Sequence, residues 1–132
     1  MARITVVDEY PDFVELMTSI LDELAGHEVT GLDSSEASLD DLLETRPDVL
    51  IADPGTATMV AGMRAARGEP AVVALRCVPM IVCSADAPAL RESADEFADL
   101  SHVYALEKPF AIDALTDLVE RALYKAALSP VA

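Results

Sequence analysis

Short apolar runs alternate along this chain with longer segments of helical periodicity. Five runs of four or five residues have the length and the apolar or β-branched composition of strands, at 4–7, 28–32, 49–52, 80–83 and 103–106. The run at 49–52 is apolar throughout, which is typical of a strand buried on both faces of a sheet. The run at 28–32 is the weakest of the five.

Two strong helical stripes flank these runs, with apolar residues at three- and four-residue steps. The first is expected to begin near Pro11 and to be closed by Gly26, and its members are Phe13, Leu16, Met17, Ile20, Leu21 and Leu24. The second stripe predicts the last helix, with Ile112, Leu115, Leu118, Val119, Ala122 and Leu123.

Three weaker helices are expected between the inner strands. They are one capped by Ser34 or Ser35 that carries Leu39, Leu42 and Leu43 and ends at Pro47, one from about Met59 to Arg67, and one from Pro88 with Leu90, Ala94 and Phe97 inward. Asp53-Pro54-Gly55 predicts a turn directly after the third strand. The pattern assigns no state to residues 71–78.

The alternation of strands and helices has a consequence for the whole chain. It implies right-handed crossovers and a doubly wound α/β fold, in which helices cover both faces of a five-stranded parallel sheet. The length of 132 residues suits a single domain, with a core expected over about residues 3–127. Ligands of such open sheets bind beyond the carboxyl ends of the strands, so polar residues at those ends are the candidates for function.

Composition excludes several classes of function. The net charge is −15, from 24 acidic and 9 basic residues, and direct binding to nucleic acid would require a basic footprint. No apolar run approaches the roughly 20 residues of a membrane span, and the first residues lack the pattern of a secretory leader, so we expect a cytoplasmic protein without a membrane partner. Cys77 and Cys83 lack the spacing of a zinc or redox site and are interpreted as reduced core residues.

Polar residues that suit phosphoryl transfer follow four of the predicted strands. They are Asp8 and Glu9 after the first strand, Asp53 after the third, Ser84 after the fourth and Lys108 after the fifth. Carboxylates are ligands that Mg²⁺ prefers, and a carboxylate can attack phosphorus when a metal and a cation neutralise the repelling charge. Taken alone, Asp53 suits a turn, Lys108 a solvated surface and Ser84 a helix cap. Their convergence at one sheet edge favours a functional site.

Four motifs in order carry a resemblance to a known family. They are Val6-Val7-Asp8-Glu9, Pro47-Asp48-Val49-Leu50-Ile51-Ala52-Asp53, Pro79-Met80-Ile81-Val82-Cys83-Ser84-Ala85 and Glu107-Lys108-Pro109-Phe110. With these motifs the sequence resembles the CheY-like receiver domain of two-component response regulators from about residue 3 to residue 123. The resemblance implies a flavodoxin-like strand order, 2-1-3-4-5.

The resemblance also implies roles for the strand-end residues. Asp53 looks like the phosphoacceptor, Ser84 like the switch hydroxyl and Lys108 like the family's lysine. Asp8, Glu9, Asp53 and the carbonyl of Gly55 would hold Mg²⁺ or Mn²⁺. A domain of this family assists only its own phosphorylation and dephosphorylation and is otherwise not an enzyme.

The same resemblance implies partners. The phosphoryl group would come from the phosphohistidine of a sensor histidine kinase or a phosphotransfer protein, and phosphorylation would alter binding to a downstream protein. Receivers of this family often pair as homodimers through their last helices. Leu118, Leu123 and Tyr124 are the candidates for such a face here.

Three positions depart from the family pattern. Glu9 stands where the family has Asp, and its extra methylene moves the carboxylate by about 1.5 Å at a site whose metal tolerates little misplacement. Pro54 removes a backbone N–H beside the phosphoacceptor. Ala105 occupies the position of the switch aromatic, and Tyr104 lies one residue earlier, so strand alternation is expected to direct Tyr104 away from that position unless a bulge intervenes.

Two other functions are compatible with parts of the pattern. The departures favour, as an alternative, a degenerate receiver that binds proteins without phosphorylation. A small flavodoxin-like enzyme or flavin carrier would need a Gly- and Ser/Thr-rich phosphate loop after the first strand. The acidic segment Glu9-Tyr10-Pro11-Asp12 argues against that function.

Overall fold

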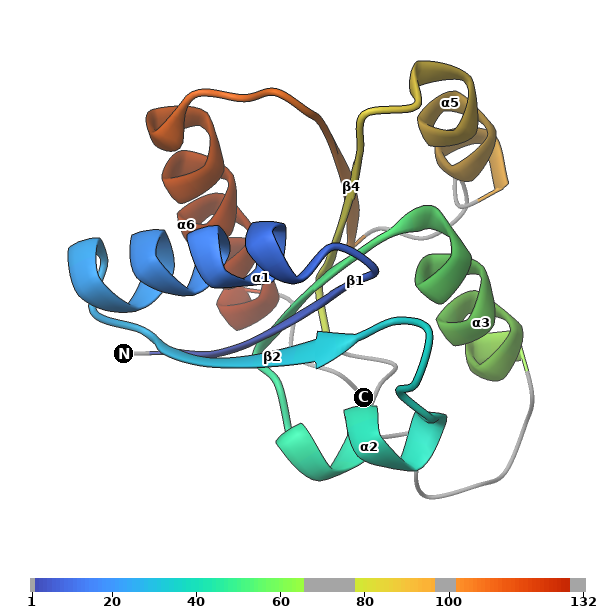
Figure 1. The fold of residues 1–132 in the computed structure, drawn as a ribbon, viewed down its shortest axis with the longest axis horizontal. Helices are drawn as coiled ribbons and strands as arrows, with labels where there is room; N and C mark the ends of the chain where they lie inside the picture. Colours follow the sequence, from blue (N-terminus) through green and yellow to red (C-terminus); the bar gives the residue numbers. More distant parts are fainter. Residues whose placement is uncertain (1, 66–77, 97–101, 129–132) are drawn as a thin grey trace.

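The computed structural model describes residues 2–65, 78–96 and 102–128, and in this part of the chain five strands form one sheet (Figure 1). The strands are β1 (Arg3–Asp8), β2 (Glu28–Asp33), β3 (Val49–Ala52), β4 (Met80–Ser84) and β5 (Val103–Glu107). Every neighbouring pair is parallel, and the order is β2-β1-β3-β4-β5. The predicted fold class and strand order are confirmed.

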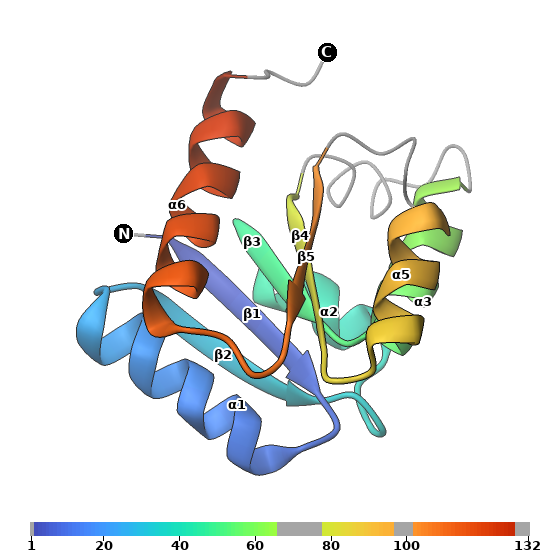
Figure 2. The same ribbon diagram turned by 90° about the horizontal axis from the view of Figure 1, so that it is seen from above.

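Helices cover both faces of the sheet (Figure 2). One face carries α1 (Pro11–Thr18), its π-helical continuation η1 (Ser19–Leu24) and α6 (Ile112–Leu128), and the other carries α2 (Leu39–Thr45), α3 (Pro54–Ala65) and α5 (Ala87–Glu96). None of the described helices is both long and apolar enough to cross a membrane.

The core consists of two apolar clusters, one on each face of the sheet. The α1–α6 cluster contains Ile4, Val6, Met17, Ile20, Leu21, Val49, Ile51, Ile81, Cys83, Leu115 and Val119. The α2–α3 cluster contains Val7, Leu42, Leu50, Ala52, Ala57, Val60, Val78, Met80, Val82 and Leu90. Burial of each large apolar side chain contributes about 1.5–3 kcal/mol. Because β3 supplies both clusters and is buried throughout, Asp53 directly follows a strand that is packed on both faces.

The first helix differs from its predicted stripe. Met17, Ile20 and Leu21 are buried, whereas Leu16 and Leu24 are 53% and 70% exposed. From Ser19 the helix becomes π-helical, which changes the angle between successive side chains, so Leu24 leaves the face that contacts the sheet. Leu16 lies beside that face rather than on it. Gly26, with φ +74°, ends the segment as predicted.

The cap of α2 is Ser38, so the prediction of Ser34 or Ser35 is wrong. Ser38 Oγ accepts a hydrogen bond from the Asp41 N–H (3.2 Å), and Asp41 Oδ2 accepts one from the Ser38 N–H (2.8 Å). This reciprocal pair is a capping box. Ser35 instead donates to Asp33 Oδ1 through its N–H and its hydroxyl, which closes the turn after β2.

The prediction of a turn after β3 and a helix from about Met59 is also wrong, because α3 begins at Pro54. Proline suits the first helical position, where the missing N–H would have no helical partner. Helix α5 begins at Ala87, one residue before Pro88, and Asp86 Oδ1 accepts the Ala89 N–H (3.1 Å). Residues 71–77 with Cys77, the end of the α3 prediction at 66–67, and Phe97 lie outside the described residues.

Candidate functional site

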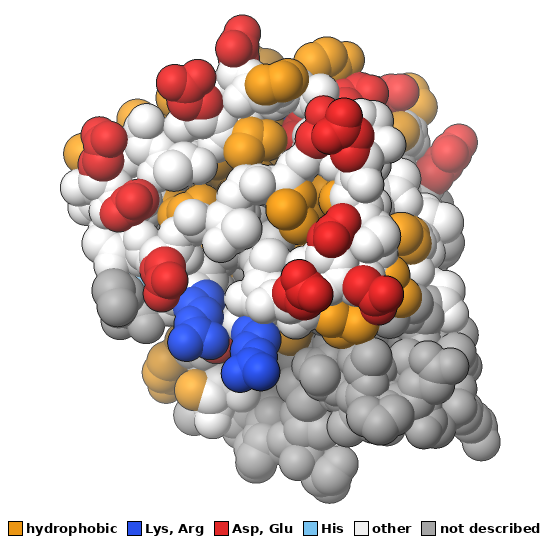
Figure 3. Space-filling view, turned by 60° about the horizontal axis from the view of Figure 1, so that its bottom comes forward, with side chains coloured by type: hydrophobic (Ala, Val, Ile, Leu, Met, Phe, Trp, Pro, Cys, Tyr) orange, Lys and Arg blue, Asp and Glu red, His pale blue; other side chains and the backbone are white. Residues whose placement is uncertain are grey.

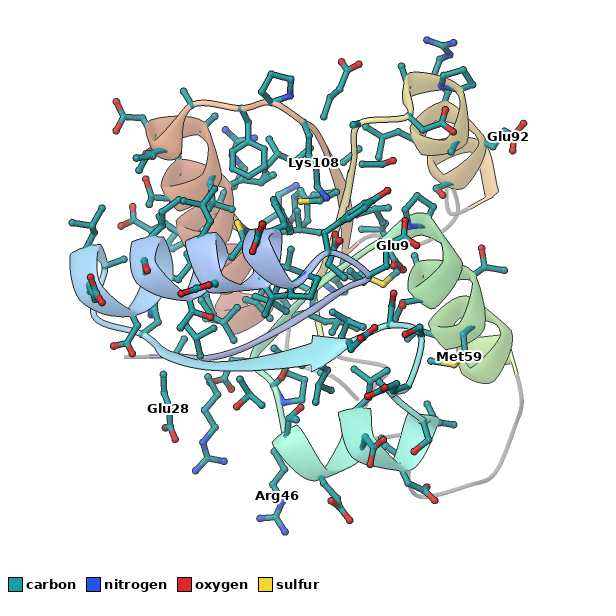
Figure 4. All side chains as sticks on the ribbon, in the orientation of Figure 1. Glu9, Glu28, Arg46, Met59, Glu92 and Lys108 are labelled. Carbon is teal, nitrogen blue, oxygen red and sulfur yellow. The ribbon has the colours of Figure 1, made fainter. Side chains whose placement is uncertain are left out.

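The carboxyl ends of β1, β3, β4 and β5 open into one cleft of about 750 Å³. It is lined by Asp8, Glu9, Tyr10, Asp12, Phe13, Asp53, Pro54, Cys83, Ser84, Ala85, Asp86, Ala89 and Lys108. Figure 4 shows Glu9 and Lys108 at this edge, reaching it from opposite ends of the chain. All the predicted strand-end residues therefore line one cleft, whereas Gly55 and Tyr104 are not among its lining residues.

The cleft contains a short and nearly buried ion pair. Lys108 Nζ lies 2.9 Å from Asp8 Oδ2, and the two side chains are 17% and 3% exposed. The second oxygen of Asp8 accepts the Tyr10 N–H (3.0 Å). The Lys108 N–H donates to the Ser84 carbonyl (2.9 Å), just before the cis peptide bond to Pro109. The lysine is thus attached through its backbone to β4 and through its side chain to β1.

Asp53 occupies the N-cap of α3 beside this pair. Its Oδ1 accepts the Thr56 N–H (2.8 Å), and its carbonyl accepts the Ala57 N–H (2.9 Å). Asp53 thus closes two backbone N–H groups at the first turn of the helix. Within the described residues no ion pair joins Lys108 to Asp53, since the lysine's ionic partner is Asp8.

Glu9 and Tyr10 form the exposed rim of the cleft. The charge of Glu9 and its hydrogen bond to the phenol raise the pKa of Tyr10. Nowhere in the described part of the chain do three or more Asp, Glu, His or Cys side chains gather as a ready metal site. Mg²⁺ is commonly held by only one or two carboxylates with water in its other positions. The carboxylate oxygens of the cleft are of the type that Mg²⁺ prefers. Among the described residues, fewer than three such side chains lie close enough together to hold an ion.

Ser84 and Cys83 end β4 with different surroundings. Ser84 Oγ accepts the Asp86 N–H (3.0 Å), which leaves the hydroxyl hydrogen free to donate elsewhere. Cys83 is 1% exposed, and burial raises the pKa of its thiol to about 12. Cys83 is therefore a buried core residue with a free thiol, as predicted.

Tyr104 lies on the opposite face of β5 from Ala105. The β4–β5 register runs without a bulge from Met80↔Val103 to Ser84↔Glu107. Tyr104, opposite Ile81, packs against the α1–α6 cluster, and Ala105 is opposite Val82, which belongs to the α2–α3 cluster. The Tyr104 hydroxyl is buried and has no hydrogen-bond partner among the described residues. The expected misalignment of this aromatic is thus present in the structure.

Sequence reasoning missed the aromatic surroundings of the lysine. Lys108 Nζ lies 3.6 Å from the ring centroid of Phe13 and 5.7 Å from that of Tyr10. Phe13 was assigned only to the apolar stripe of the first helix. Phe13 lies in the first turn of α1, directly after the carboxyl end of β1. That position could have indicated a contact with the strand-end residues.

Comparison with known proteins identifies the fold. No family model and no curated protein matches the sequence. Among solved structures, the chemotaxis response regulator CheY4 of Vibrio cholerae is similar, with 21% identity, a TM-score of 0.74 and coverage of 93% of this chain and 99% of that one. The signal receiver domain of a histidine kinase from Syntrophus aciditrophicus matches with 21% identity, a TM-score of 0.73 and coverage of 100% and 97%. The chain has the fold of response-regulator receiver domains.

Proposed function

We propose that this chain is a phosphoacceptor receiver domain of a two-component system. Asp53 accepts a phosphoryl group from a phosphohistidine of a sensor histidine kinase or a phosphotransfer protein, with Mg²⁺ or Mn²⁺, and phosphorylation alters binding to a downstream protein. The observation that carries the proposal is the convergence of Asp53 with Asp8 and Lys108 in one cleft. The receiver fold of the chain supports it.

The transfer is a displacement at phosphorus. One carboxylate oxygen of Asp53 forms the new P–O bond while the P–N bond to the donor imidazole breaks. The imidazole leaves with the bonding electron pair and is protonated, and the product is an acyl phosphate on Asp53. Lys108 neutralises charge on the phosphoryl oxygens, and the Ser84 hydroxyl, whose hydrogen is free to donate, binds one of them.

The proposed metal depends on a small set of oxygen donors. Asp8, Glu9 and Asp53 would hold it, and its charge would reduce the repulsion between the carboxylate and the incoming phosphoryl group. A contribution from the Gly55 carbonyl stays a prediction, since Gly55 is not among the residues that line the cleft. Asp8 already pairs with Lys108, so metal binding and this ion pair draw on the same carboxylate.

Substitution of Asp53 tests the acceptor assignment. Asp53→Asn should abolish acid-labile phosphorylation by acetyl phosphate in the presence of Mg²⁺, because the amide is a far weaker nucleophile. The matched control is Asp33→Asn, which changes an aspartate at the carboxyl end of β2 that does not line the cleft, and it should keep parental labelling. Labelling of Asp53→Asn at the parental level would refute the assignment.

A second function, protein binding without phosphorylation, is favoured by two observations. Glu9 lies close enough to the Tyr10 phenol for its charge to raise the pKa of Tyr10, and Tyr104 lies on the opposite face of β5 from the switch position. Titration with Mg²⁺ and then beryllofluoride, followed by NMR amide shifts, separates the functions. A phosphoacceptor should bind both reagents at the cleft, whereas a degenerate receiver should bind neither.

The charge of the surface bears on the partners. The net charge is −15, and Figure 3 shows acidic side chains spread over one face with Lys or Arg side chains together at one place. Such a surface attracts a basic protein partner and repels nucleic acid. A cytoplasmic location, where sensor kinases present their phosphohistidines, is part of the proposal.

A homodimer through α6 also stays a proposal. Leu118 and Leu123 pack partly buried against the α1–α6 cluster, so they belong to the core of one chain. Tyr124 is 67% exposed and is the member of the predicted face that a second copy could contact.

A further inference from the structure

We infer that Phe13 is a positioning residue for Lys108, with its ring holding the ammonium beside Asp8. The inference rests on the proposed function, because it assigns a second support to the lysine that would bind the phosphoryl group. The contact between Phe13 and Lys108 is present in the unphosphorylated protein. It can therefore be tested without phosphorylation.

The contact is a close cation–π interaction. Lys108 Nζ lies 3.6 Å from the centroid of the Phe13 ring, while Tyr10 is more distant, at 5.7 Å. A cation within about 6 Å of an aromatic centroid is attracted by the ring's quadrupole, and the attraction grows when both groups are shielded from water. The lysine side chain is only 17% exposed. Phe13 is therefore the stronger of its two aromatic contacts.

The charges of the cleft make such a support useful. Lys108 is the one basic side chain among the described lining residues, and five acidic residues line the same cleft, Asp8, Glu9, Asp12, Asp53 and Asp86. A flexible lysine in this setting could pair with several of them. An uncharged ring on one side and Asp8 on the other reduce its freedom without adding another negative charge.

The Phe13 ring also packs against a second aromatic ring. Phe13 and Phe110 meet edge to face, with centroids 6.2 Å apart and an interplanar angle of 84°. Both rings are partly buried against the α1–α6 cluster. This packing joins α1 to the segment that follows β5, but the ring over the Lys108 ammonium is that of Phe13 and not that of Phe110.

A restrained ammonium should assist phosphoryl transfer. Charged groups that are already oriented where charge develops need little rearrangement during the reaction. Replacement of Phe13 by leucine keeps an apolar side chain and removes the ring. We expect phosphorylation of Phe13→Leu by acetyl phosphate to be about five- to tenfold slower, in line with the strength of a partly shielded cation–π contact.

The direct test is the NMR chemical shift of the Lys108 ε-methylene protons, which a ring face displaces upfield. Phe13→Leu should abolish the displacement, and Phe13→Tyr, which keeps the ring, should retain it. Phe110→Leu is the matched control, because it removes comparable packing without removing the ring beneath the ammonium. It should retain both the upfield shift and a phosphorylation rate within about twofold of the parent.

The outcomes separate the inference from the proposed function. An unchanged Lys108 shift in Phe13→Leu, or equal loss of the shift in Phe110→Leu, would overturn the positioning role. A parental or faster phosphorylation rate in Phe13→Leu would overturn it as well. Absence of labelling at Asp53 in the parent would refute the proposed function alone, since the NMR comparison of the variants would still decide whether Phe13 positions the lysine.

Discussion

Two ion pairs lie near opposite edges of the sheet and differ chiefly in burial. At the carboxyl edge, Lys108 and Asp8 are 2.9 Å apart and 17% and 3% exposed. At the amino edge, Arg3 and Glu28 are 4.0 Å apart and 57% and 65% exposed. Exposed pairs contribute about 0–1 kcal/mol because water screens them, whereas loss of one partner from a buried pair costs about 3–5 kcal/mol.

Each pair lines its own hollow. The amino-edge hollow, of about 460 Å³, contains Arg3 with the carboxylates of Glu28, Asp41 and Glu44, and Figure 4 shows Glu28 extending outward there. Both hollows thus combine one cation with several acids. Of the two pairs, the one at the carboxyl edge is shielded from water, so its charges interact strongly with neighbouring groups. Electrostatic stabilisation of a phosphoryl group is strongest in such a shielded site.

The largest expected difference between the edges is in stability. Lys108→Met should lower the free energy of unfolding by about 2–4 kcal/mol, below the limit for a fully buried pair because the cleft is open to water. The reason is that the nearly buried Asp8 carboxylate loses its counter-charge. Arg3→Met, the matched change at the amino edge, should cost less than about 0.5 kcal/mol. Urea denaturation measures both values.

A double-mutant cycle shows whether the pair itself is the cause. Asp8→Asn combined with Lys108→Met should be less destabilised than Lys108→Met alone, because no unpaired charge is left buried. Additive losses in the cycle, or equal losses for the Lys108 and Arg3 variants, would remove the distinction between the two edges.

Local pattern was sufficient for the sheet but not for every helix. The unbroken apolar run at 49–52 predicts β3 and its burial on both faces, because a strand covered on both sides needs no polar face. The starts of α2 and α3 depend on which polar residue acts as the N-cap. Several neighbouring residues in the sequence could have done so. Ser38 and Asp53 are the N-caps because their side chains accept backbone N–H groups of the first turn. The sequence pattern does not specify that geometry.

The candidate site was likewise predictable from the sequence only in part. The carboxyl ends of parallel strands share an edge, so Asp8, Asp53 and Lys108 could be grouped from sequence alone. Which carboxylate Lys108 pairs with depends on side-chain packing between residues about a hundred positions apart. The contact with Phe13 was missed for that reason, although strand alternation was enough to place Tyr104 on the other face from Ala105.

An intermediate effect is expected for metal binding at the carboxyl edge. Glu9→Asp should raise the affinity for Mg²⁺ about three- to tenfold, because a shorter side chain suits an ion that demands near-ideal octahedral geometry. Calorimetric titration with MgCl₂ measures the change.

The matched control for this change lies at the amino edge. Glu28→Asp removes the same methylene from an exposed glutamate and should leave Mg²⁺ affinity at the parental value. Unchanged or weaker binding by Glu9→Asp would mean that the Glu9 carboxylate does not contact the ion.

The smallest effect is expected for Tyr104, which lines neither hollow. Its hydroxyl is buried with no hydrogen-bond partner in the described part of the chain, and such a group is costly to bury. Tyr104→Phe should therefore raise the free energy of unfolding by about 0.5–1 kcal/mol. Since Tyr104 packs on the opposite face from Ala105, the amide shifts that beryllofluoride induces should match those of the parent. Loss of these shifts would show that the phosphorylation signal crosses the sheet through this ring, and that the functional edge extends beyond the cleft.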